Sequence, residues 1–297
     1  MYHVAYDTAL NATSHQPHEE PGTIRVPVFI ESGFLSGTHY GDDPGGYAMV
    51  FRRIHSDNPD DIGKNVEMAW HVKPCLKYNL IDGMAIAQAI RTITAELRAS
   101  RDTTLASAGS NKDILLNRVI IQIFSAKRKT LEALQASQAS GFVDRDESLW
   151  NKVVGAIIDE SLRLGELGLD VGLELHWCPG NCNQDPSRVP APLTRARELA
   201  HWARRKHKNH YRVGEGLKQE LDVSTSVFEE FLPDFQTEHY EYQLYLNDQK
   251  LQREIAKLRR RNKNAEARWL ARQEEHMHQG DTEGGAQPDY AAARVQD

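Results

Sequence analysis

The apolar run at residues 119–124, Val-Ile-Ile-Gln-Ile-Phe, restricts the fold of this chain more than any other segment. Its length is that of a strand, and its apolar character is nearly continuous rather than alternating. Strands of this kind are buried on both faces, in sheets that helices cover on both sides. The run therefore predicts a central parallel strand in a sheet flanked by helices.

Three strands are predicted before this run, at residues 24–30, 47–51 and 66–72, where β-branched and aromatic residues are frequent. Turn-rich segments connect them, which is typical of an antiparallel meander. Pro27 lies within the first strand and predicts an edge position or a strand start for it, because proline cannot donate to a ladder.

After residue 80 the apolar spacing becomes helical, which predicts a helix over 80–97. Further helices are predicted at 127–138, 147–167 and 193–206, and a fifth strand at 171–177. The order is three strands, helix, strand, two helices, strand, helix. It indicates an α/β fold with a five-stranded mixed sheet flanked by helices.

The two ends of the chain differ from this central part. Residues 1–23 are polar and are expected to form a flexible leader, and residues 209–240 a connecting segment. A long helix is predicted at 241–277, followed by a disordered tail at 278–297 that is rich in Gly, Gln and Ala.

The long helix contains a heptad pattern. Leu244, Leu251, Leu258 and Ala265 recur every seven residues, and Ile255 and Trp269 occupy the second seam position. Asp248 and Asn262 interrupt that second position. Two interpretations therefore stay open: a coiled coil that mediates self-association or a protein contact through residues 244–270, and a single amphipathic helix.

Composition excludes several classes of protein. A net charge of −6 argues against coating nucleic acid by bulk charge, although a local basic patch can still bind phosphates. The three cysteines, Cys75, Cys178 and Cys182, indicate a reducing cytoplasmic or nuclear compartment and lack a second ligand pair for structural zinc. No stretch of about 18 apolar residues occurs, so no membrane partner is expected.

Several local motifs resemble the ribonuclease H type 1 family over residues 24–208. Residues 173–181, Leu-Glu-Leu-His-Trp-Cys-Pro-Gly-Asn, are similar to the family's fifth strand and its Trp-Val-Pro-Gly-His turn. Further similarity lies in Gly-Gly-Tyr-Ala at 45–48, Phe-Ser at 124–125 and Arg-Glu-Leu-Ala at 197–200. The resemblance implies a ribonuclease H-like fold.

Active members of that family cleave the RNA strand of an RNA–DNA hybrid with two metal ions held by four carboxylates. The resemblance places the family's first-strand and first-helix carboxylates on Glu31 and Asp82, which are the residual candidates for catalysis and metal binding. The other two carboxylates fall on Ala126 and Arg197, and the turn histidine falls on Asn181. Three of the five positions have thus lost their chemistry.

The leading hypothesis is a catalytically degenerate ribonuclease H-like pseudoenzyme that binds nucleic acid or a protein and needs no cofactor. One alternative is an active RNA–DNA hybrid ribonuclease using Mg²⁺ or Mn²⁺ in a reorganised site, in which Glu198 or Asp185 supplies a missing carboxylate. Another is a structural interaction module without nucleic-acid contact. Arg197 is expected either to face solvent or to pair with Glu31 or Asp82.

Residues 201–212 form the most basic segment next to the predicted domain, with two aromatic residues among the cations. If the protein binds an RNA–DNA hybrid or RNA, Arg204, Arg205, Lys206 and Lys208 are the expected phosphate contacts. The alternative is a solvated helix end, where cations are favoured by the helix dipole.

Overall fold

The structure is a computed structural model that describes residues 3–4, 6–13, 23–33, 45–73, 78–107, 118–139, 149–180, 189–215 and 227–283. The chain divides into two compact units, Met1–Tyr240 and Glu241–Asp297, and each is described by itself.

The described strands are β1 (His3–Val4), β2 (Thr23–Gly33), β3 (Gly45–Arg52), β4 (Asn65–Val72), β5 (Arg118–Ser125), β6 (Asp170–Trp177) and β7 (His210–Val213). The described helices are α1 (Tyr6–Thr13), α2 (Tyr78–Ser107), α3 (Arg128–Ala139), α4 (Leu149–Gly165), α5 (Ala191–Lys206) and α6 (Val227–Glu283), with a short 3-10 turn at η1 (Pro59–Asp61).

The strands form one mixed sheet in the order β1-β6-β5-β2-β3-β4-β7. β2, β3 and β4 pair antiparallel, while β5 runs parallel to both β2 and β6. The predicted meander and central parallel strand are confirmed, as is the α/β class with a mixed sheet flanked by helices. The predicted strand number is wrong, because the sheet has seven strands rather than five. The two additional strands, β1 and β7, are too short to show a sequence period.

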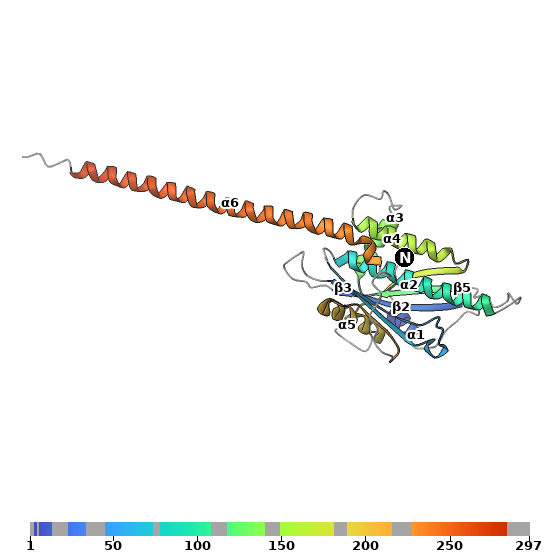
Figure 1. The fold of residues 1–297 in the computed structure, drawn as a ribbon. Helices are drawn as coiled ribbons and strands as arrows, with labels where there is room; N and C mark the ends of the chain where they lie inside the picture. The colour runs from blue at the N-terminus through green and yellow to red at the C-terminus, as the bar shows by residue number, and fades with distance from the viewer. Residues whose placement is uncertain are drawn as a thin grey trace, which may run out of the picture. The chain divides into compact units, whose positions relative to one another are not determined.

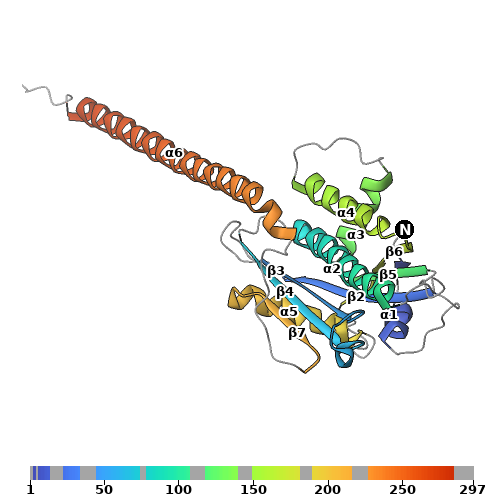
Figure 2. The same cartoon turned by 45° about the vertical axis from the view of Figure 1, so that its right-hand side comes forward.

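Helices cover both faces of the sheet, as Figures 1 and 2 show, with α2 and α4 on one side and α5 on the other. Val119, Ile121 and Ile123 of β5 belong to the core under α2. Phe124 belongs to the core on the opposite face, where it stacks on Phe29 at 5.0 Å between ring centroids. Because β5 supplies both cores, its sequence is apolar almost throughout.

The edge position that Pro27 predicts for β2 is wrong, because β2 lies between β5 and β3. The register explains how proline is accommodated there. Pairing with β5 includes Pro27, whereas pairing with β3 begins only at Val28. Proline therefore occupies the stretch of β2 that has one neighbouring strand, so its missing donor costs no hydrogen bond to β3.

Part of the expected flexible leader is folded. α1 buries Ala9 completely, in the same cluster as Phe29 and Leu193, and the carbonyl oxygen of Thr13 accepts a hydrogen bond from Arg52 Nη2 at 3.1 Å. The segment has no apolar run that would predict a helix from the sequence, and α1 is recognised only in the structure, where it packs against the sheet.

The chain after residue 208 also differs from expectation. The segment predicted as a connection at 209–240 contains β7, which pairs with β4, and the start of α6. The helix predicted at 241–277 is longer and spans Val227–Glu283, so it includes the first residues of the predicted disordered tail. Residues 284–297 of that tail lie outside the described residues.

The backbone of α5 approaches the sheet closely at two glycines. A Cβ atom added at Gly46 would lie 2.6 Å from the carbonyl oxygen of Ala200, and one at Gly33 would lie 3.3 Å from the same carbonyl. Both neighbours are backbone atoms, so they cannot move without shifting the helix. Glycine at the end of β2 and at the start of β3 thus lets α5 lie against the sheet.

We expect Gly46→Ala to lower the free energy of unfolding by about 1–3 kcal/mol, because the added methyl group overpacks the contact between β3 and α5. Urea denaturation measures this change. Gly155→Ala in α4 is the matched control, since a Cβ there meets nothing within 4 Å and alanine favours the helix. Equal stability changes in the two variants would contradict the close-packing explanation.

Candidate functional site

Two carboxylates converge where β2 ends and α2 begins. Glu31 lies near the end of β2 and Asp82 near the start of α2, and each is 3% exposed. Ser32 connects them: its backbone N–H donates to Glu31 Oε2 at 3.3 Å, and its hydroxyl donates to Asp82 Oδ1. The structure therefore brings together the two residues that the motif alignment predicts as neighbours.

The Glu31 carboxylate is paired with two cations. Arg197 of α5 donates from Nε and Nη2 to Oε1 at 3.2 Å each. Lys127, which precedes α3, places its Nζ 3.3 Å from Oε2. Each carboxylate oxygen thus has its own positive partner. Of the alternatives expected for Arg197, the structure shows pairing with Glu31.

The Asp82 carboxylate is held by hydroxyl groups. Besides Ser32, the Thr130 hydroxyl donates to Oδ2 at 2.8 Å. The pKa of Asp82 is raised to about 6, chiefly by burial and also by repulsion from the Glu31 carboxylate. The charge of Lys127 and the two hydroxyl hydrogen bonds oppose this increase in pKa. Asp82 is thus a buried acid whose charged form is only partly compensated.

Arg197 also lies beside the positions where the family resemblance places other functional residues. A Cβ atom added at Gly180 would collide with Arg197 Nη2 and would lie 3.0 Å from the Ala126 side chain. Glycine after β6 therefore leaves room for the guanidinium. Glu31, Ala126 and Arg197 meet in one place, as the alignment predicts, while Asn181 lies outside the described residues.

Glu198 does not supply a replacement carboxylate. Its side chain is exposed and accepts a hydrogen bond from Arg195 Nη1 at 3.1 Å, on a different face of α5 from Arg197. Adjacent helical residues point about 100° apart, which accounts for this separation. Asp185 lies outside the described residues.

Sequence reasoning missed three residues of this site: Ser32, Lys127 and Thr130. None belongs to a recognised motif. Lys127 directly follows Ala126, so its place beside the missing family carboxylate was readable from the alignment. The contacts of Ser32 and Thr130 with Asp82 join residues 50 and 48 positions apart, which no local pattern reveals.

A metal pair does not fit these residues. Two metal ions need several convergent carboxylates, whereas here one of the two carboxylates is already neutralised by Arg197 and Lys127. Within the part of the chain that the structure describes, no three His, Cys, Asp or Glu side chains gather as a candidate metal site. Cys178 is buried and free, and burial raises its pKa to about 11.

The basic segment at residues 201–212, which includes the last turn of α5, is only partly exposed. Arg205, Lys206 and Lys208 face solvent, but Arg204 is 5% exposed, so its prediction as a surface phosphate contact is wrong. Ala200 and Ala203 pack against the sheet, and Arg204 follows Ala200 by one helical turn on the inward side. Arg204 lies on the face of α5 that is buried against the sheet, and the sequence spacing did not show which face that is.

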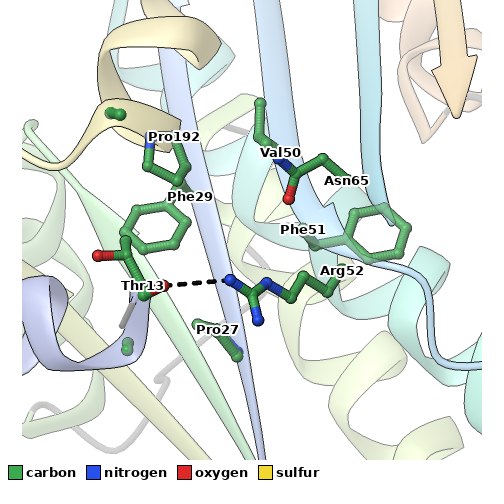
Figure 3. A pocket seen from close by; sticks show the side chains of 10 residues that line it. Thr13, Pro27, Phe29, Val50, Phe51, Arg52, Asn65 and Pro192 are labelled. Atoms are coloured by element: carbon green, nitrogen blue, oxygen red, sulfur yellow. Dashed lines mark hydrogen bonds between the residues drawn. The ribbon is translucent and has the colours of Figure 1, made fainter. Parts of the chain in front are cut away.

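A separate cavity of about 230 Å³ lies between α1, the start of α5 and the sheet. Thr13, Pro27, Phe29, Arg52 and Pro192 are among its lining residues, and Figure 3 shows the hydrogen bond from Arg52 to Thr13 across it. Neither Glu31 nor Asp82 lines this cavity.

No family model matches the sequence, and no curated protein matches it. Among solved structures, the chain is similar to LC9-RNase H1, a type 1 RNase H with the type 2 active-site motif. The two share 16% identity over 72% of this chain and 82% of that chain, with a TM-score of 0.39. A likeness this distant assigns neither a family nor a function. No described helix is long and apolar enough to cross a membrane.

The raised pKa of Asp82 predicts a specific pH dependence of stability. Its pKa is 3.8 ordinarily and about 6 in the folded protein, so folding favours the protonated form. The protonated Asp82 carboxyl therefore adds to the free energy of unfolding below about pH 4, and this contribution is lost as the pH rises through about 6. A shift of this size corresponds to ~3 kcal/mol.

We therefore expect the free energy of unfolding of the wild type, relative to Asp82→Asn, to fall by up to ~3 kcal/mol between about pH 4 and about pH 7. Asparagine keeps the shape and polar contacts of the side chain but does not titrate. Denaturant titrations at several pH values measure the difference. Parallel stability curves for the two proteins would contradict the raised pKa.

Proposed function

We propose that this chain is a ribonuclease H-like protein that binds nucleic acid without cleaving it, because an ion-pair cluster occupies the position of the metal site. The observation that carries the proposal is the Glu31 carboxylate, whose two oxygens pair separately with Arg197 and Lys127. These cations compensate the buried charge that metal ions compensate in active relatives.

The electrostatics oppose metal binding and therefore catalysis. A divalent ion between Glu31 and Asp82 would lie next to the positive charges of Arg197 and Lys127, and it would find only two carboxylates. Charge stabilisation by metal ions contributes several kcal/mol to such reactions, and each 1.4 kcal/mol is about tenfold in rate. Without this stabilisation by metal ions, at most a very slow reaction is expected.

The binding part of the proposal rests on the end of α5. Arg205, Lys206 and Lys208 are exposed within four residues, and His207 ends the helix in the left-handed conformation with φ of 54°. The partial negative charge at the C-terminus of α5 favours cations whether or not they bind a ligand. The partner is therefore inferred from the fold as well as from the charge. The ribonuclease H-like architecture favours nucleic acid, an RNA–DNA hybrid or RNA, as the partner.

Cleavage and metal binding test the first part. We expect no hybrid cleavage by the wild type with Mg²⁺ or Mn²⁺ above the level of a Glu31→Ala, Asp82→Ala variant. We expect the combination of Ala126→Asp with Arg197→Asp to gain Mn²⁺ binding, measured by titration calorimetry, because it restores two carboxylates and removes one cation. Arg205→Asp makes the same charge change as Arg197→Asp, on α5 but outside the site, and should gain none. Metal-dependent cleavage by the wild type that the alanine changes abolish would overturn the proposal.

Salt dependence tests the second part. We expect neutralisation of Arg205, Lys206 and Lys208 to glutamine to weaken binding of an RNA–DNA hybrid and to reduce the log–log salt slope by up to about three, one unit per phosphate contact. Fluorescence anisotropy at several salt concentrations measures both. Arg118→Gln, an exposed cation at the start of β5, is the control. Binding unaffected by the triple change would favour a protein-interaction role instead.

A further inference from the structure

The part of α6 in the second unit carries an exposed apolar seam. Leu251 and Leu258 are 57% and 55% exposed, and Trp269, further along the helix, is 58% exposed. A single helix leaves such side chains in water, whereas a heptad repeat buries them between two helices. The residues in and beside the seam indicate which partner covers it.

We propose that α6 pairs with α6 of a second copy as a parallel, in-register, two-stranded coiled coil. The seam assigns Leu244, Leu251, Leu258 and Ala265 to heptad position d, and Asp248, Ile255, Asn262 and Trp269 to position a. One of the four heptads, with Ile255 at a and Leu258 at d, has the combination that favours two strands over three or four. This inference does not depend on the proposed nucleic-acid function.

Asn262 selects the parallel orientation. In a parallel, in-register dimer, each a residue faces the same residue of the other copy, so the two Asn262 amides can hydrogen-bond to one another. In an antiparallel dimer, a positions face d positions, and Asn262 would lie against a leucine or alanine of the seam without a polar partner. The residue that interrupts the apolar pattern therefore specifies the register.

The charges beside the seam agree with this orientation. In a parallel dimer, each g residue meets the e residue five positions later in the other copy. Glu254 then faces Arg259 of the second copy, and Arg261 faces Glu266, so both charged pairs are attractive. In the single helix, Lys257 Nζ donates to Glu254 Oε1 at 2.7 Å. Both side chains are exposed, so replacing this contact by the pair between Glu254 and Arg259 of the second copy costs little free energy.

Most of the remaining charges of α6 lie away from the seam, and only Asp248 at position a and Arg272 at position d fall on it. From residue 250 to residue 272 the helix has nine Lys or Arg and two Glu, a net charge of +7 (9 − 2). Lys250, Arg253, Lys257 and Arg260 fall at outer c and f positions. Across a two-stranded coil such positions are about 20 Å apart, beyond the screening length of about 8 Å at physiological salt.

Oligomeric state tests the seam. We expect the full chain to sediment as a dimer, and Leu251→Glu combined with Leu258→Glu to sediment as a monomer at the same concentration. Lys250→Glu combined with Lys257→Glu adds two glutamates at outer positions and should stay dimeric. Circular dichroism confirms that each variant remains folded. A monomeric wild type, including one whose seam packs on its own first unit, would overturn the proposal, as would a trimer or tetramer.

Charge exchange and crosslinking test the orientation. Arg259→Glu should weaken the dimer roughly tenfold, since two attractive pairs become repulsive, and adding Glu254→Arg should restore it. Ile255→Cys and Asn262→Cys should each form a disulfide with their own counterpart, because only parallel, in-register helices bring both positions together with themselves. The wild type controls for the natural cysteines. Failure of the rescue, or crosslinking at only one position, would exclude the parallel arrangement.

Discussion

The buried Glu31 carboxylate is the constraint on which the rest of the site depends. A charge removed from water costs several kcal/mol unless opposite charges and hydrogen bonds compensate it. Arg197 and Lys127 supply that compensation from two different elements, α5 and the segment before α3. The ion pairs therefore join β2 to helical segments on both faces of the sheet.

Close packing determines whether those cations can reach the carboxylate. Gly33 and Gly46 allow the backbone of α5 to approach β2 and β3, and Gly180 leaves space for the guanidinium of Arg197. Larger residues at these positions would displace either the helix or the side chain. Gly46 and Gly180, which lie in stretches that resemble family motifs, thus have a packing role in the structure.

The two carboxylates of the site are compensated in different ways. Its carboxylates converge as metal ligands do, yet their compensation comes from protein cations for Glu31 and from hydroxyl groups for Asp82. Because Asp82 is compensated less completely, burial raises its pKa to about 6, which makes this site pH-sensitive.

The sequence by itself determined the order of the main strands and helices, since the apolar run of β5 and the helical spacing after residue 80 are local patterns. It also indicated that Glu31, Asp82 and Arg197 belong to one site. Only the tertiary structure decided that Lys127 joins Glu31, that Arg204 is buried, that β1 and β7 extend the sheet, and that α1 packs against it. These features depend on contacts between residues far apart in the chain, and such contacts leave no period in the sequence.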